Sequence, residues 1–104
     1  MLNQLVIVGR LVSNIELKEN EEGKYAEITL AVPRSYKNAE GDYDTDFIKV
    51  LILNSIAENS VEYLKQGDLI GIKGRIESIK MESDYSIQII AEKLTFLSNK
   101  KEEV

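Results

Sequence analysis

The chain has 104 residues, of which 43 % are hydrophobic and 30 % are charged, and its formal net charge is −5. This length suits one domain, and the composition is that of a folded globular protein. Neither Cys nor His occurs in the sequence, which excludes disulfides, zinc sites with the usual nitrogen and sulfur ligands, and catalysis by Cys or His. No run of about eighteen apolar residues is present, so the sequence predicts no membrane span.

The N-terminal stretch MLNQLVIVGR has neither the basic region nor the cleavage site of a signal peptide. Its apolar run predicts a first strand over Leu5–Val12. Because both faces of this strand are apolar apart from Arg10, we expect it to be covered on both sides. These features favour a mature cytoplasmic protein.

A second strand follows from the alternation over Lys24–Val32, and Pro33 is expected to end its pairing. The next stretch, RSYKNAEGDYDTDF (Arg34–Phe47), reads as a loop that mixes three aromatic residues with four carboxylates. A third strand is predicted from about Asp46 to Leu53. Its inner face holds Ile48, Val50 and Ile52, and its outer face holds Phe47, Lys49, Leu51 and Leu53.

One helix is predicted in NSIAENSVEYLKQGD, with Asn54 or Ser55 as its N-cap and Gly67 as its C-terminal stop. Lys65 would then lie in the last turn, where a cation suits the helix dipole. The spacing of the apolar residues predicts a buried stripe made of Ile56, Val61 and Leu64.

A fourth strand is predicted from Leu69 to about Lys80, the stretch MESDY reads as a hairpin turn, and Ser86–Leu97 forms a fifth strand. In the fourth strand, the inward positions are Ile70, Ile72 and Ile76, and the outward positions are Lys73, Arg75, Ile79 and Met81.

This order of elements predicts an all-β protein, a five-stranded OB-fold Greek-key barrel with one helix between strands 3 and 4. The OB-fold domain would span residues 1–97, and residues 98–104 would form a short charged tail. In this fold the usual ligand surface is the face of strands 2 and 3, flanked by the loops that join strands 1–2 and 4–5.

Four segments of the chain, MLNQLVIVGRLVSNIELK, AEITLAVPRSYKN, TDFIKVLILNSIAENSVEYLKQGDLIGIKGRI and AEKLTFL, together resemble bacterial single-strand DNA-binding proteins. The resemblance spans roughly Met1–Leu97. It implies a protein that coats single-stranded DNA without strong sequence specificity during replication, recombination or repair. It also implies a homotetramer, with a homodimer as the alternative, in which the first strand lies near a subunit interface.

The same resemblance assigns the binding residues. Tyr36 and Phe47 match two of the family's four stacking aromatics, whereas Leu53 and Met81 replace the other two. The family's long tail, which recruits replication or repair proteins through an acidic tip, has only residues 98–104 as its counterpart.

Cations are needed to contact the phosphates of such a ligand. The candidates are Arg10, Arg34, Lys37, Lys49, Lys73, Arg75 and Lys80. Several share the outward parity of Phe47 or Met81, so they can occupy one side of the barrel. Acids gather in a separate turn that contains Glu16, Glu19, Glu21 and Glu22, so a net-negative chain can still present a positive groove. We expect Tyr25 and Tyr63 to be structural, and Tyr43 has no assigned role.

Two other functions are open at this point. The first is an OB-fold adaptor of a primosome-like replication-restart complex, which acts through protein contacts; a dimer would favour it, and a tetramer would favour the coating protein. The second is an OB-fold subunit that has lost DNA binding, as the charge of −5 suggests. An enzyme is the least favoured class because nothing resembles an activated nucleophile or a tuned acid–base pair. The sequence predicts no metal, cofactor or membrane partner, and a cytoplasmic, nucleoid-associated or phage-encoded protein.

Overall fold

The computed structural model describes residues 1–97, and the predicted tail at 98–104 lies outside the described residues. The elements in chain order are β1 (Leu5–Leu11), β2 (Lys18–Asn20), β3 (Gly23–Lys37), β4 (Tyr43–Leu53), α1 (Asn54–Tyr63), β5 (Leu69–Lys80) and β6 (Tyr85–Phe96). The sheet closes on itself because β1 pairs with both β3 and β5. The β4–β6 pairing is parallel and the others are antiparallel.

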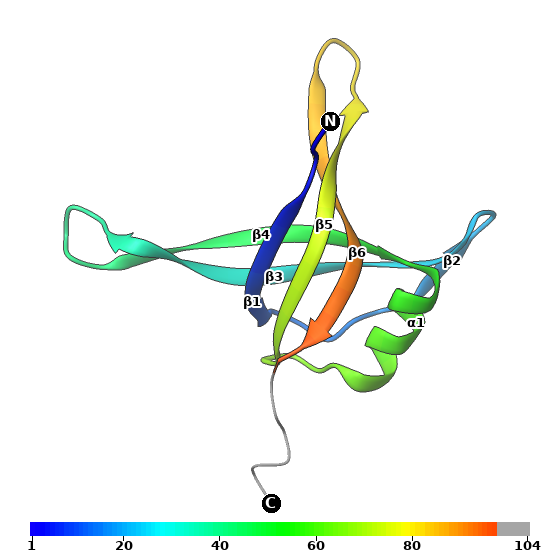
Figure 1. The fold of residues 1–104 in the computed structure, drawn as a ribbon, viewed down its shortest axis with the longest axis horizontal. Helices are drawn as coiled ribbons and strands as arrows, with labels where there is room; N and C mark the ends of the chain where they lie inside the picture. The colour runs from blue at the N-terminus through cyan, green and yellow to red at the C-terminus, as the bar shows by residue number, and fades with distance from the viewer. Residues whose placement is uncertain (98–104) are drawn as a thin grey trace, which may run out of the picture.

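This architecture confirms the predicted five-stranded barrel with a helix between its third and fourth long strands (Figure 1). The strand β2 is a three-residue addition that pairs with the start of β3. The core follows from alternation along the long strands, since cross-strand partners such as Ala26–Ile52 and Ile28–Val50 are buried together. Ile70 and Ile72 of β5 complete the same core.

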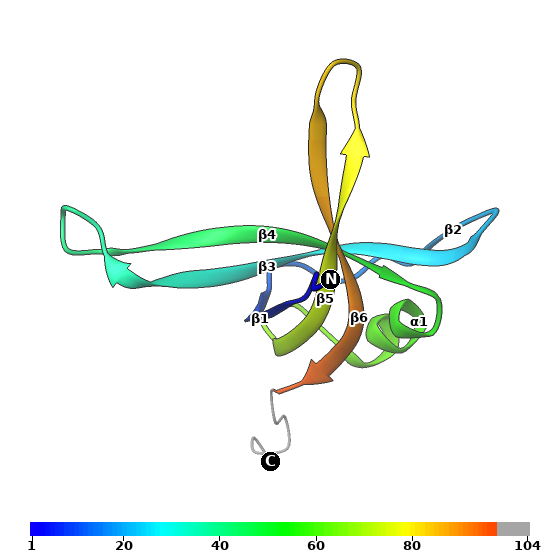
Figure 2. The same ribbon diagram turned by 45° about the horizontal axis from the view of Figure 1, so that its top comes forward.

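Beyond the barrel, the β3–β4 and β5–β6 hairpins continue as projecting arms that point in different directions (Figures 1 and 2). We call residues 33–47 the first arm and residues 76–89 the second arm. The predicted loop over Arg34–Phe47 is therefore mostly strand, because β3 runs on past Pro33 to Lys37 and β4 begins at Tyr43. Pro33 does not end the pairing; instead the register shifts between Pro33 and Lys37.

Two predictions about burial do not hold within this single chain. Ile76 was expected to face inward but is 40 % exposed, because it lies on the second arm beyond the body of the barrel. The first strand was expected to be covered on both sides, yet Val6 is 75 % and Val8 is 48 % exposed. The outer face of β1 is thus an open apolar surface of this chain.

The predicted helix ends are also wrong. The helix begins at Asn54 with Leu53 in the N-cap position and no side-chain cap, and it ends at Tyr63, so Lys65 lies outside it. Gly67 has φ +93° and serves the turn that follows, where its N–H donates to the carbonyl of Leu11 at 2.8 Å.

The predicted stripe is confirmed for Ile56, which packs against the core, and for Leu64, which is buried just past the end of the helix. The helix differs from the prediction in its other positions. Its buried face carries Ala57 and Ser60, whereas Val61 is exposed. Small side chains let the helix pack closely beside β3 and β4.

Gly74 lies where β5 and β6 change register, and a Cβ atom there would collide with the carbonyl of Ile90. We predict that Gly74→Ala lowers the free energy of unfolding by about 1–3 kcal/mol, as overpacking does in other cores. The matched control is Gly71→Ala, whose Cβ atom would meet only side chains at ordinary distances, Leu97 at 3.4 Å and Val8 at 3.8 Å. Urea unfolding at one protein concentration compares them, and equal losses would contradict the assignment.

Candidate nucleic-acid interface

The outer face of β3 and β4 is the surface on which most of the predicted binding residues of the first arm meet. The register pairs Ala31 with Phe47 and Thr29 with Lys49, and these pairs point outward because the alternate positions fill the core. Phe47 is 65 % exposed, and Lys49 is exposed beside it. The predicted outward direction of both side chains is confirmed.

Arg10 lies in the same row as Phe47. Ala31 is the cross-strand partner of Arg10 on β1 and of Phe47 on β4, so the three residues form one line across three strands. Cross-strand partners on an antiparallel pair share a face, which places a guanidinium on one side of the small Ala31 and a ring on the other. A shallow, mainly apolar groove of about 350 Å³ lies here, and its lining includes Arg10, Ala31 and Thr45.

Arg10 is anchored within this row. Its Nη1 donates to the carbonyl of Gly67 at 3.1 Å, which leaves the remaining N–H groups of the guanidinium to serve a ligand. The turn at Gly67, which was predicted to stop the helix, thus positions Arg10, a predicted phosphate contact.

The two faces of the first arm have opposite character. Along β4, residues Tyr43, Thr45 and Phe47 alternate with Asp44 and Asp46, so rings and carboxylates point to opposite sides. Arg34 lies with the carboxylates: its Nε and Nη2 donate to Asp46 at 2.9–3.2 Å, and its Nη1 lies 3.9 Å from Asp44.

The Arg34–Asp46 contact shifts both groups. The hydrogen bond from Arg34 lowers the pKa of the Asp46 carboxyl, and the same bond raises the pKa of Arg34. Arg34 therefore offsets part of the negative charge of Asp44 and Asp46 on one face. The role of Arg34 in binding phosphate stays a prediction. The Arg34 guanidinium already has two carboxylate partners.

Lys37 and Tyr43 close the tip of the first arm. They are cross-strand partners, and the Lys37 ammonium lies 5.8 Å from the centroid of the Tyr43 ring. Tyr36, the predicted stacking residue, is exposed on the same arm. Sequence reasoning found Lys37 and Tyr36 but gave Tyr43 no role, because the Lys–Tyr pairing depends on the register.

Other predicted residues lie on β5 and the second arm, away from the row of Phe47. Arg75 donates to Glu77 at 2.8 Å and to Glu92 at 3.1 Å, and these bonds, the one to Glu77 above all, raise its pKa. Lys80 lies 5.8 Å from the ring centroid of Tyr85, a residue that the sequence reasoning missed. Met81 is exposed at the turn.

Lys73 lies on neither arm. It is exposed on β5 as the partner of Val6 on β1. The cations are therefore distributed over the two arms and the β1 surface rather than along one wall.

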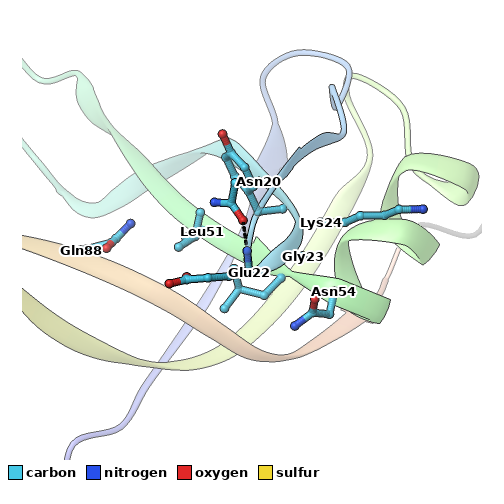
Figure 3. A pocket seen from close by; sticks show the side chains of 9 residues that line it. Asn20, Glu22, Gly23, Lys24, Leu51, Asn54 and Gln88 are labelled. Carbon is cyan, nitrogen blue, oxygen red and sulfur yellow. Dashed lines mark hydrogen bonds between the residues drawn. The ribbon is translucent and has the colours of Figure 1, made fainter.

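The far end of the outer face holds a second groove, of about 490 Å³ (Figure 3). Leu51, Leu53 and Tyr25 form its apolar part, and Asn20, Asn54 and Gln88 supply amide groups. Leu53, predicted to take the place of a stacking ring, is thus a groove-lining side chain opposite Tyr25.

Acids are present at this end of the outer face. Glu22 lines the second groove, with its N–H donating to Asn20 Oδ1 at 2.9 Å, and Glu27 is exposed opposite Leu51. The expectation that the acids of the first turn lie apart from the binding face is wrong for Glu22. The cationic and aromatic half of the face is therefore the half nearer the first arm.

Comparisons with known proteins show the family of the chain. The model of the single-strand binding protein family matches residues 2–97. The chain belongs to this family. Among its relatives, single-stranded DNA-binding protein 3 of Listeria innocua is 37 % identical over 107 residues, which cover 97 % of this chain and 67 % of the relative. Single-stranded DNA-binding protein B of Bacillus subtilis is 34 % identical over 109 residues, which cover 99 % of this chain and 96 % of that protein.

Solved structures of lower identity share the fold of this family member. A single-stranded DNA binding protein from Thermus aquaticus superposes with a TM-score of 0.81 at 24 % identity, over 96 % of this chain and 52 % of that one. The SSB of Plasmodium falciparum in complex with ssDNA gives a TM-score of 0.78 at 21 % identity, over 94 % of this chain and 96 % of that one. The chain thus spans about half the length of the Thermus protein.

Two further findings concern the described residues alone. Within residues 1–97, no helix has the length and apolar character needed to cross a membrane. In the same part of the chain, no cluster of His, Cys, Asp or Glu side chains is placed to hold a metal ion.

We predict that Arg34→Gln raises the pKa of the Asp46 carboxyl toward its ordinary value, as measured by NMR titration. Because the folded-state pKa of Asp46 lies below its unfolded value, the pair stabilises the fold above the unfolded pKa and loses this effect as the pH falls through the folded pKa. The variant should therefore be slightly less stable than the parent at pH about 7 and equally stable in strong acid.

Arg75→Gln is the matched control for this experiment, because it removes a carboxylate-bound guanidinium on β5 and leaves Asp46 untouched. An Asp46 pKa that is the same with and without Arg34 would contradict the assigned pairing.

Proposed function

We propose that this chain binds and coats single-stranded DNA without strong sequence specificity, in the bacterial cytoplasm, as a non-enzymatic protein of replication, recombination or repair. Its relatives are named as single-stranded DNA-binding proteins, and this favours the coating role over a primosome-like adaptor. The outer face of β3 and β4, with the first arm, is the proposed contact surface.

The row of Arg10, Ala31 and Phe47 is the observation that carries the proposal. Single-stranded DNA offers flat base faces and one phosphate per nucleotide, so a ring beside a cation serves both parts of one nucleotide. The small Ala31 lines a groove beside Arg10 in this row, together with Pro33 and Thr45. Adjacent strands lie about 4.8 Å apart, so β1 and β4 are about 10 Å apart on either side of β3.

Net charge does not prevent this binding, because the charge close to the ligand matters most and four carboxylates are already paired with two arginines. Arg34 engages Asp44 and Asp46, while Arg75 engages Glu77 and Glu92. In contrast, none of the four lysines proposed to contact phosphates has a carboxylate within ion-pair distance among residues 1–97; they are Lys37, Lys49, Lys73 and Lys80. On the half of the outer face nearer the first arm, Lys37 and Lys49 therefore supply positive charge to a ligand although the total is −5.

Oligomerisation raises the affinity further in this proposal. The exposed Val6 and Val8 give β1 an apolar face that suits contact with a second copy. We propose a homotetramer, with a homodimer as the alternative. Linked sites on one strand of DNA then bind with an effective concentration set by the assembly, which offsets the loss of two family aromatics.

We predict that Phe47→Ala weakens binding to poly(dT) by about 1–3 kcal/mol, which is roughly 5- to 150-fold. Fluorescence titration measures this loss. Tyr63→Ala is the control, because Tyr63 is an exposed ring on α1 that contacts Phe96 at a centroid distance of 6.2 Å. Equal binding by the Phe47 variant and the parent would count against the proposed face.

The same titration at several salt concentrations counts the phosphates. If about four phosphates are neutralised, log K falls with log salt at a slope of about −3. A slope near zero would exclude a phosphate-tracking site.

A groove-filling variant tests the row itself. Ala31→Leu places a larger side chain between Arg10 and Phe47, and we predict at least about a fivefold loss of poly(dT) affinity, the lower bound for losing one stacked base. Ala39→Leu is the control, since Ala39 is exposed in the turn of the first arm. Unchanged affinity of the Ala31 variant would show that the ligand does not enter this groove.

A further inference from the structure

We propose that Tyr43 and Lys37, at the tip of the first arm, form an additional nucleotide contact in which the Tyr43 ring stacks on a base and the Lys37 ammonium faces a phosphate. This inference rests on the proposed function and deepens it. It assigns a role to an aromatic residue that has none so far.

The position of Tyr43 along β4 is the first reason. Tyr43, Thr45, Phe47 and Lys49 are alternate residues of one strand, so they share a face. The extra residues at the register shift belong to β3, which leaves the alternation along β4 regular. With a rise of about 3.3 Å per residue, Tyr43 lies about 13 Å from Phe47 along the same surface, toward the tip of the arm.

The exposure of the ring is the second reason. Tyr43 is 56 % exposed on an arm that projects from the barrel (Figure 2). A ring at this place gains little from packing on the core. A ligand that crosses the outer face and continues along the arm would meet it directly after Phe47.

The partner of the ring is the third reason. The Lys37 ammonium lies 5.8 Å from the ring centroid, and Lys37 has no carboxylate partner among residues 1–97. The cation therefore lies over one face of the ring, and a base can stack on the opposite face. This arrangement repeats the ring-and-cation chemistry of Phe47 and Arg10.

The turn that carries the pair is already ordered by its own hydrogen bonds. Asn38 Oδ1 accepts from the N–H groups of Glu40 and Asp42, each at 2.9 Å. Asn38 Nδ2 donates to Asp44 Oδ1 at 3.1 Å, which holds that carboxylate on the face away from Tyr43. A preformed tip lowers the ordering cost of binding.

A simpler role exists for the same pair, because a cross-strand Lys–Tyr contact also stabilises a hairpin. The two roles differ in what a change of ring chemistry does to DNA affinity. A hairpin-stabilising residue can be replaced by another β-former without loss of binding, whereas a stacking residue cannot.

The test compares poly(dT) affinity at one salt concentration for the parent, Tyr43→Thr, Tyr43→Phe and the control Tyr63→Ala. Thr keeps strand propensity and removes the ring, and Phe keeps the ring. We expect Tyr43→Thr to bind at least about fivefold more weakly, which is the lower bound for loss of one stacked base, and the other two to bind within about twofold of the parent. Circular dichroism checks that the strands are retained.

A spectroscopic measurement identifies direct contact. The chain contains no Trp, so Tyr43→Trp introduces a single reporter, and Tyr63→Trp provides the matched reporter on α1. Poly(dT) should quench the emission of the Trp at position 43 and leave that at position 63 nearly unchanged.

Two results would overturn the inference, and they are distinguishable. If the parent binds poly(dT) while Tyr43→Thr binds equally well and the Trp at position 43 is not quenched, the tip is only a hairpin closure and the proposed function stands. If the parent itself does not bind, both the proposed function and this inference fail.

Discussion

The side-chain alternation along β4 is the constraint on which the binding surface depends. A strand presents successive side chains to opposite faces, so the carboxylates of Asp44 and Asp46 lie on the face opposite to the rings of Tyr43 and Phe47. Arg34 then engages both carboxylates on their own face. The outcome is an arm with a partly compensated acidic side and an aromatic side, which a loop of the same composition would not produce.

The barrel converts this one-strand pattern into a surface. Because β1 pairs with β3 as well as with β5, Arg10 is brought into line with Ala31 and Phe47. Closure of the sheet is also what buries the alternate residues of β3 and β4, so the core and the binding face are specified by the same register. A one-residue slip between these strands would send Phe47 inward and Ile48 outward.

Much of the fold could be predicted from local patterns. The alternation of side chains predicted the long strands, their inner residues except Ile76, and the outward direction of Phe47 and Lys49. The order of elements predicted the OB-fold. The helix ends could not be predicted, because Gly67 serves a turn whose partner, Leu11, is distant in sequence. Neither the Arg10–Phe47 row nor the Lys37–Tyr43 pair is visible in composition, since each depends on which residues face one another across strands. The placement of Glu22 in a groove depends on the same long-range geometry.

The central claim is that DNA lies on the aromatic side of the first arm and not on its carboxylate side. Photo-cross-linking of a bromodeoxyuridine oligonucleotide to the intact protein, followed by peptide mass spectrometry, tests this claim directly. The account predicts cross-links at Phe47 and its outward neighbours on β3 and β4. Cross-links confined to the Asp44–Asp46 side of the arm, or to α1, would contradict it.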